Sequence, residues 1–226
     1  MKKILLMILL ISTLLVAKTE LKEGDYSWFR GGSQAFLKIS KQNNNLYTIK
    51  GDCYYGLARK YGPNMGDISF QAPLKNGKII YKNKEYGNYI FTLIVNEDGS
   101  FDVTEKGAKP FGHNASFFGH FTSDNLPSFS CEKAYTFVEH AICDNLKIAQ
   151  LDKKMARTYS TYKIVFYFAK NRKSLEKKLK IEQHKWIKER DKCEYRKTYK
   201  MCLENSYKRR IKVLEKALNN FWTYDE

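Results

Sequence analysis

Four cysteines in the second half of the chain stand in two closely spaced pairs, Cys131 with Cys143 and Cys193 with Cys202. Their chemistry is disulfide formation, and each pair falls where a helix is expected to begin or end. Four cysteines allow three connectivities, of which proximity and the helix ends favour the two local bridges Cys131–Cys143 and Cys193–Cys202. The fifth cysteine, Cys53, lies in a candidate strand, where we expect a buried free thiol. An intermolecular disulfide or a catalytic thiol is the alternative for Cys53, although no base or orienting group stands near it in the sequence.

Helical periodicity surrounds the four cysteines and must position them. Thr136 and Glu139 have the spacing of a capping box, which accounts for both residues without catalysis. Asp144 is expected to cap a second helix over about 146–169, Ser174 a third helix, and a final helix follows Cys202. The apolar stripes of the three long helices are Leu151, Met155, Tyr159, Tyr162 and Phe166; Leu175, Leu179, Gln183, Trp186, Arg190 and Cys193; and Leu203, Tyr207, Ile211, Leu214, Leu218 and Phe221. These stripes predict a small bundle or hairpin held by disulfides.

The order of residues over 127–214 resembles the LprI-type lysozyme-inhibitor domain, a small secreted helical family. The family pattern is a Cys, an Ala, Thr-x-x-Glu, Ile-Cys, Leu-Asp, Gln-x-x-Trp-x-x-x-Arg-x-x-Cys, a further Cys and Tyr-x-x-Arg-Ile-x-x-Leu. This chain supplies it with Cys131, Ala134, Thr136, Glu139, Ile142, Cys143, Leu151, Asp152, Gln183, Trp186, Arg190, Cys193, Cys202, Tyr207, Arg210, Ile211 and Leu214. The resemblance implies inhibition of lysozyme by a plug in its sugar-binding cleft.

Arg190 lies on an apolar stripe and therefore needs a partner, because an unpaired buried charge is strongly unfavourable. Asp152, next to the core residue Leu151, is the natural candidate. We expect a buried ion pair that sets the register of two helices; the alternative is that the two residues form a binding centre.

The beginning of the chain predicts export from the cytoplasm, and its uneven charge favours anionic partners of the basic helical half. Residues 1–17 have a basic start, an apolar run and Ala17 at a plausible cleavage point, the pattern of a signal peptide. We therefore expect a periplasmic or secreted protein without a stable membrane span after cleavage. Removing Lys2 and Lys3 lowers the formal charge from +16 to +14. From residue 127 onward, 24 Lys and Arg stand against 13 Asp and Glu (+11), whereas residues 18–126 carry 14 against 11 (+3).

Residues 18–126 are predicted to form an all-β domain. Short runs rich in Tyr, Phe, Ile and Val alternate with turn signals such as Asn76-Gly77 and Asp98-Gly99. Eight candidate strands cover 25–30, 34–40, 46–53, 67–71, 78–82, 89–95, 100–105 and 117–122. They suggest a small barrel or sandwich, lipocalin-like in shape. A polar segment that contains a proline, residues 123–128, marks the boundary to the helical domain, residues 127–226.

One loop of the β domain is a candidate for reaching a partner: it contains Lys109, His113, Asn114 and Ser116. His113 and His120 lack the spacing of a compact metal site, so no metal is expected. Tyrosines in the predicted strands could line a ligand pocket, but they fit a plain core better.

Together these features predict an α+β protein without catalytic residues or cofactor: an antiparallel β barrel or sandwich followed by a small helical bundle with two disulfides. The expected function is that of an exported envelope binding protein related to lysozyme inhibitors. Common lysozymes are basic, so a partner of about +14 would meet them slowly at low salt. A scaffold for anionic envelope polymers, another envelope protein as partner, and a small-ligand carrier built on the β domain are the alternatives. No nucleic-acid-binding motif is present.

Overall fold

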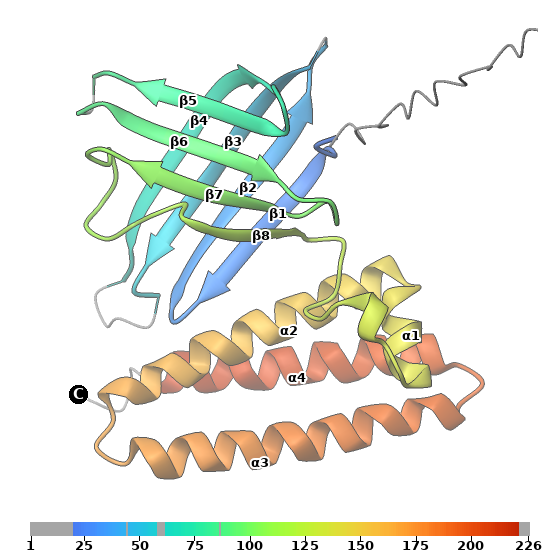
Figure 1. Ribbon diagram of the computed structural model, residues 1–226. Coiled ribbons are helices and arrows are strands. Elements are labelled where there is room, and N and C mark those ends of the chain that lie inside the picture. Colours follow the sequence, from blue (N-terminus) through green and yellow to red (C-terminus); the bar gives the residue numbers. More distant parts are fainter. Residues whose placement is uncertain (1–19, 44, 58–61, 86, 222–226) are drawn as a thin grey trace, which may run out of the picture.

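Eight antiparallel strands make up the first half of the computed structural model, which describes residues 20–43, 45–57, 62–85 and 87–221. The strands are β1 (Gly24–Arg30), β2 (Ser33–Lys41), β3 (Leu46–Tyr55), β4 (Asn64–Pro73), β5 (Lys78–Asn83), β6 (Tyr89–Val95), β7 (Phe101–Lys106) and β8 (Gly119–Ser123). The strands form one sheet in the order β4-β3-β2-β1-β8-β7-β6-β5. The sheet curls until its two edge strands, β4 and β5, lie close to each other, which makes a nearly closed barrel (Figure 1). The predicted fold class is confirmed; the predicted signal segment lies outside the described residues.

Tight turns between the strands follow from residues that accept positive φ. Gly31 and Gly32 join β1 to β2 with φ of 59° and 77°, and Asn76 and Gly77 precede β5 with φ of 49° and 71°. Positive φ at both central residues matches the right-handed twist of the flanking strands. Asp98-Gly99 lies, as predicted, in the turn that joins the paired strands β6 and β7. Of these two residues only Gly99 has positive φ, because the turn is closed over more residues by Asn96 N–H donating to the Ser100 carbonyl at 2.9 Å.

The inside of the barrel is filled by side chains. Alternation along β6 buries Tyr89, Phe91, Leu93 and Val95, as the sequence predicts. Aromatic rings from most strands meet in this core, among them Tyr26, Phe70, Phe91, Phe101, Phe117 and Phe121. The edges of β4 and β5 are not paired in the sheet; there the Phe70 and Tyr81 rings stack with centroids 4.2 Å apart. A core packed with aromatic rings argues against a small-ligand carrier.

Helices form the second half: α1 (Phe137–Cys143), α2 (Leu146–Val165), α3 (Arg172–Asp191) and α4 (Tyr199–Phe221), with short 3-10 turns at Cys131–Lys133, Phe166–Phe168 and Lys192–Tyr195. Two predicted caps are wrong by one and three residues. Asn145, whose side-chain oxygen accepts from Ile148 N–H at 3.1 Å, caps α2 in place of Asp144. Asn171 stands at the cap of α3 in place of Ser174, because the chain enters the helical turn earlier.

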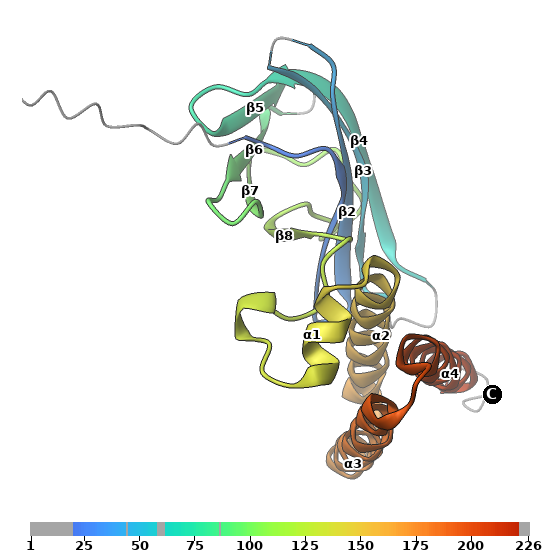
Figure 2. The same cartoon turned by 90° about the vertical axis from the view of Figure 1, so that its right-hand side faces the viewer.

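The helices lie below the barrel in layers. Helix α2 runs directly beneath the barrel, α4 lies beside α2, and α3 is farthest from the strands (Figures 1 and 2). Helices α2 and α4 bury most of the helical core, including Ile148, Met155, Leu203 and Tyr207. None of the described helices has the length and apolar character needed to cross a membrane.

A buried lysine joins the two halves. Lys153 of α2 is 6% exposed, and its ammonium group donates to the carbonyls of Thr122 and Ser123 at 2.8 and 2.7 Å. The Asp124 carboxylate lies 3.2 Å from the same nitrogen. Burial lowers the pKa of Lys153, and these oxygens offset the loss of water around the charge. Periodicity alone places Lys153 among ordinary polar helix residues, so this contact is a finding of the tertiary structure.

Each half has its own hydrophobic core, and this supports the proposed division into residues 18–126 and 127–226. We expect a fragment of residues 127–226 to show helical circular dichroism on its own when oxidised. Reduction should unfold it, because each local disulfide contributes about 2–3 kcal/mol by restricting the unfolded chain. A fragment that is disordered when oxidised, beside a helical full-length chain, would contradict the division.

Candidate functional site

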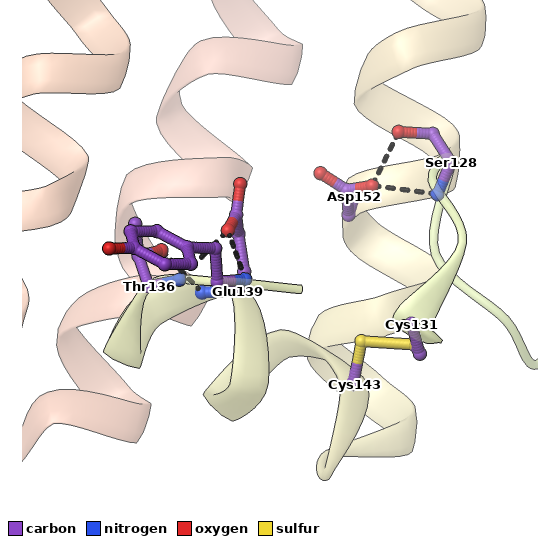
Figure 3. Close-up of a disulfide and its surroundings, with 7 residues drawn as sticks. Ser128, Cys131, Thr136, Glu139, Cys143 and Asp152 are labelled. Carbon is purple, nitrogen blue, oxygen red and sulfur yellow. Dashed lines mark hydrogen bonds between the residues drawn. A yellow bond between two sulfur atoms is a disulfide. The ribbon is translucent and has the colours of Figure 1, made fainter. Parts of the chain in front are cut away.

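Two disulfides fix the ends of the helices. Cys131 and Cys143 are bonded with Cα atoms 5.9 Å apart, and Cys193 and Cys202 with Cα atoms 5.6 Å apart, as predicted. The first bridge ties the turn after the barrel to the end of α1 (Figure 3). The second closes the connection from α3 to α4.

The Thr136–Glu139 capping box is present at the start of α1. Glu139 N–H donates to Thr136 Oγ1 at 3.1 Å, and the Glu139 carboxylate accepts from the amides of Thr136 and Tyr135, both at 2.9 Å (Figure 3). These hydrogen bonds hold the pKa of Glu139 below its usual range. Both residues therefore serve the helix end.

Asp152 is the centre of a buried polar network. Its Oδ2 accepts from the Ser128 amide at 2.8 Å and from the Ser128 hydroxyl at 2.6 Å (Figure 3). Its Oδ1 accepts from the Tyr207 hydroxyl at 2.7 Å. Asp152 itself is 3% exposed. Through these hydrogen bonds it connects α2 to two other parts of the chain: the segment that follows the barrel, at Ser128, and α4, at Tyr207.

The predicted direct ion pair between Asp152 and Arg190 is wrong, because the Tyr207 hydroxyl lies between them. Arg190 NH1 donates to Tyr207 Oη at 2.9 Å, and Tyr207 donates in turn to Asp152. The remaining guanidinium donors of Arg190 bind the Asp191 carboxylate, at 2.9 and 2.7 Å. Burial and the neighbouring Asp152 carboxylate raise the pKa of Tyr207, which keeps its proton in this chain of hydrogen bonds.

The other motif residues extend this network between α3 and α4. Trp186 Nε1 donates to Ser206 Oγ at 3.1 Å, and its ring packs edge-on against Tyr207. Gln183 Oε1 accepts from Arg210 Nε at 2.9 Å. Burial lowers the pKa of Arg210, and its NH2 atom has no hydrogen-bond partner in the described part of the chain. The motif residues thus hold three helices in register and make no catalytic arrangement.

The candidate partner loop is anchored to the barrel by a buried carboxylate. The Glu105 side chain is 1% exposed, and its Oε2 lies 3.1 Å from Lys109 Nζ and accepts from the Ser116 hydroxyl. Its Oε1 accepts from the Tyr89 hydroxyl at 2.6 Å. Lys109 and Ser116 are therefore both bonded to Glu105, although the Lys109 side chain is still 38% exposed. The sequence showed no sign of this role for Glu105, whose charge looks like that of any strand-end residue.

His113 and Asn114 form the exposed tip of the same loop. The His113 carbonyl accepts from Asn64 Nδ2 at 2.6 Å, and Gly112 N–H donates to the Met65 carbonyl at 2.9 Å, so the loop lies against the start of β4. His120 is separate from His113 and instead contacts the Asp102 carboxylate at 2.9 Å. No three His, Cys, Asp or Glu side chains within the described residues are grouped to hold a metal ion.

Cys53 lies buried in β3 of the barrel. Burial, with the Glu105 carboxylate nearby, raises the pKa of its thiol to about 12. A thiol with this pKa is almost entirely protonated at neutral pH, so it is a poor nucleophile.

The fold and the buried network together define a class: a small β barrel joined to a disulfide-bonded helical domain whose motif side chains hold the helices together. Residues 130–214, the helical half, match the family model described as Lysozyme inhibitor LprI. The resemblance seen in the sequence is thereby confirmed for this half of the chain. Comparison with curated proteins and with solved structures finds no significant match.

Proposed function

We propose that the protein is an exported envelope protein that inhibits lysozyme by occupying its sugar-binding cleft. The observation that carries this proposal is the match of residues 130–214 to the lysozyme-inhibitor family, several of whose motif side chains form buried hydrogen bonds between the helices. Two disulfides suit an oxidising compartment, which agrees with the export signal expected at residues 1–17.

The surface that contacts lysozyme must lie outside the motif itself. Asp152, Gln183, Arg190 and Arg210 are all at most 9% exposed, so their polar groups lie inside the domain and out of reach of another protein. A plug needs donors that reach the acidic groups of the enzyme's cleft. On the candidate loop, the tip residues His113 and Asn114 are exposed, whereas Lys109 and Ser116 are held by Glu105.

Binding of anionic envelope polymers is the second candidate, and a specific surface favours it. Lys38 of β2 and Lys50 of β3 stand directly opposite each other, an arrangement of like charges that costs stability. Both line a hollow of about 590 Å³ between the barrel and α2. Arg157 also lines it, with its guanidinium 4.9 Å above the Phe36 ring. None of these three cations lies within ion-pair distance of a described carboxylate, although Asp25, Asp52 and Asp124 line the same hollow and Asp124 acts on Arg157. An anionic chain would add opposite charge beside Lys38 and Lys50.

A lysozyme turnover assay with the purified chain from residue 18 tests the first function. We expect cell-wall hydrolysis by at least one lysozyme type to fall as the protein is added, and the inhibition to persist at about 0.15 M salt, where long-range charge interactions are largely screened. Lys38→Glu/Lys50→Glu should leave this inhibition unchanged while abolishing retention on an immobilised polyanion. Unchanged turnover of every lysozyme type tested, beside salt-sensitive polyanion binding, would replace the first function by the second.

A further inference from the structure

The barrel wall is incomplete between β1 and β8. Pairing between these strands covers only Tyr26 with Ser123 and Ser27 with Thr122, although β1 continues to Arg30 and β8 begins at Gly119. Beyond the two pairs the strands diverge, and β8 turns toward β7 (Figure 1). The two strand ends thus face a gap instead of each other.

Strand geometry shows which backbone groups face this gap. Asp124 N–H donates to the Asp25 carbonyl at 2.8 Å, so the backbone of Asp25 points toward β8. Because backbone groups alternate in direction along a strand, those of Ser27 and Phe29 point the same way. Continuing the register of β1 and β8 places His120 opposite Phe29, beyond the last pair. The gap therefore presents strand edges that an added polypeptide segment can pair with.

A groove of about 1030 Å³ lies along the gap, between the barrel and the segment that leads to the helices. Its walls include large apolar side chains in contact with water: Phe118 is 61% exposed and Leu126 48% exposed. Trp28 lies over Gly119, where a Cβ atom would come within 2.8 Å of the indole ring. The buried indole Nε1 of Trp28 has no acceptor among the described residues, so the groove also contains an unused hydrogen-bond donor.

The charge of this groove is opposite to that of the whole protein. Three carboxylates line it, from Asp98, Asp102 and Glu132. The basic residues in its walls are Arg30, Lys153, whose charge is balanced by Asp124, and His120, whose Nδ1 lies 2.9 Å from Asp102 Oδ1. A protein with a formal charge of +16 therefore has a locally acidic groove beside exposed apolar side chains. Such a surface attracts a basic protein, whereas it repels an anionic polymer.

We propose that the groove between β1 and β8 is the surface that binds lysozyme, with Phe118 as its apolar anchor and Asp98, Asp102 and Glu132 meeting cationic side chains of the enzyme. This inference rests on the proposed inhibition and adds a contact outside the acidic cleft: the groove meets basic side chains on the surface of the enzyme, and the donors that enter the cleft come from the exposed loop tip at His113 and Asn114. Lysozyme and this protein are both basic and should repel each other at long range. A groove lined by carboxylates removes this difficulty, because it gives the basic enzyme a local surface of opposite charge. The Phe118 amide lies 3.2 Å from Glu105 Oε2, so the anchored loop holds the Phe118 backbone at the edge of the groove.

Two pairs of variants test the proposal in the full chain. Phe118→Ser removes the anchor, and Ile80→Ser, at a side chain that is 50% exposed on β5, is its matched control. Glu132→Lys reverses a groove charge, and Glu85→Lys makes the same change at an exposed residue outside the groove. All four sites are exposed, so we expect each variant to keep the circular dichroism and melting temperature of the natural protein.

The measurements are inhibition of a c-type lysozyme and its association rate with the immobilised inhibitor. We expect Phe118→Ser to weaken inhibition by about tenfold or more, as truncation of an aromatic interface anchor does. Glu132→Lys should slow association at low salt, and the difference should fade near 1 M salt, where the Debye length is about 3 Å. Both controls should behave like the natural protein.

The two proposals fail in different ways. If the natural protein inhibits c-type lysozyme and both groove variants inhibit equally well, the groove is not the contact surface, while the inhibitory function stands. If the natural protein leaves lysozyme turnover unchanged, the proposed function falls and this inference falls with it. A third outcome would also overturn the proposal. If the protein is retained on a polyanion and both Phe118→Ser and Glu132→Lys weaken this retention, the groove binds an anionic polymer.

Discussion

Replacing Asp152 with alanine is expected to lower the free energy of unfolding by about 2–4 kcal/mol, because the buried Tyr207 hydroxyl loses a charged acceptor at about 1–3 kcal/mol and the Ser128 hydrogen bonds are lost as well. The change leaves the buried Tyr207 hydroxyl without its acceptor, and the Ser128 amide, which belongs to an exposed residue, loses the same carboxylate. It also removes the carboxylate from the hydrogen-bond chain that ends at Arg190. Urea unfolding followed by helical circular dichroism measures the loss. Asp144→Ala, at an exposed carboxylate of the same domain, is the control and should change stability by less than about 0.5 kcal/mol.

A set of mutant cycles tests the role of Tyr207 directly. Asp152→Ala and Arg190→Ala should be coupled by about 0.5–3 kcal/mol in the natural protein, the range for residues of one network. In a Tyr207→Phe background the coupling should fall below about 0.5 kcal/mol, the usual level for independent sites. An undiminished coupling in that background would mean that the two charges interact without the bridging hydroxyl. A coupling near zero in the natural protein would reject the network altogether.

Glu105→Ala should destabilise the barrel by about 2–5 kcal/mol, because the Tyr89 and Ser116 hydroxyls each lose a charged acceptor at about 1–3 kcal/mol. The carboxylate is almost fully buried and is bound by Tyr89, Ser116 and Lys109. Without it, the buried Tyr89 hydroxyl loses its acceptor, and the loop that contains Lys109 and Ser116 loses its anchor. We therefore expect faster tryptic cleavage after Lys106, next to the freed loop.

Two controls separate this effect from a general loss of charge. Glu97→Ala removes an exposed carboxylate from the same half of the chain and should leave both stability and cleavage unchanged. Glu105→Gln keeps the shape of the side chain but loses its charge, and should cost about 1–3 kcal/mol, the penalty for poorly satisfied buried partners. A Glu105→Ala variant as stable as the natural protein would show that the loop is held by its apolar contacts alone.

Most of the features that the sequence predicts correctly are formed by residues that lie close together in the chain. The alternation from Tyr89 to Val95, the Asn76-Gly77 turn and the Thr136–Glu139 capping box depend on neighbours within a few residues. Cysteine pairs twelve and nine residues apart could be assigned from proximity for the same reason. Such features need no knowledge of how distant elements pack, because the hydrogen bonds or bridges that define them close within one element or one turn.

Only the tertiary structure decided which buried polar groups meet. Asp152 and Tyr207 are 55 residues apart, and their hydrogen bond puts the Tyr207 hydroxyl between Asp152 and Arg190. Lys153, Glu105 and the gap beside Phe118 likewise depend on where a helix or loop settles against the barrel. A sequence pattern predicts that a buried charge needs a partner, but it does not predict which residue that partner is. The energy of a buried hydrogen bond depends on distances and angles, and these are set by the packing of elements that are remote in the sequence.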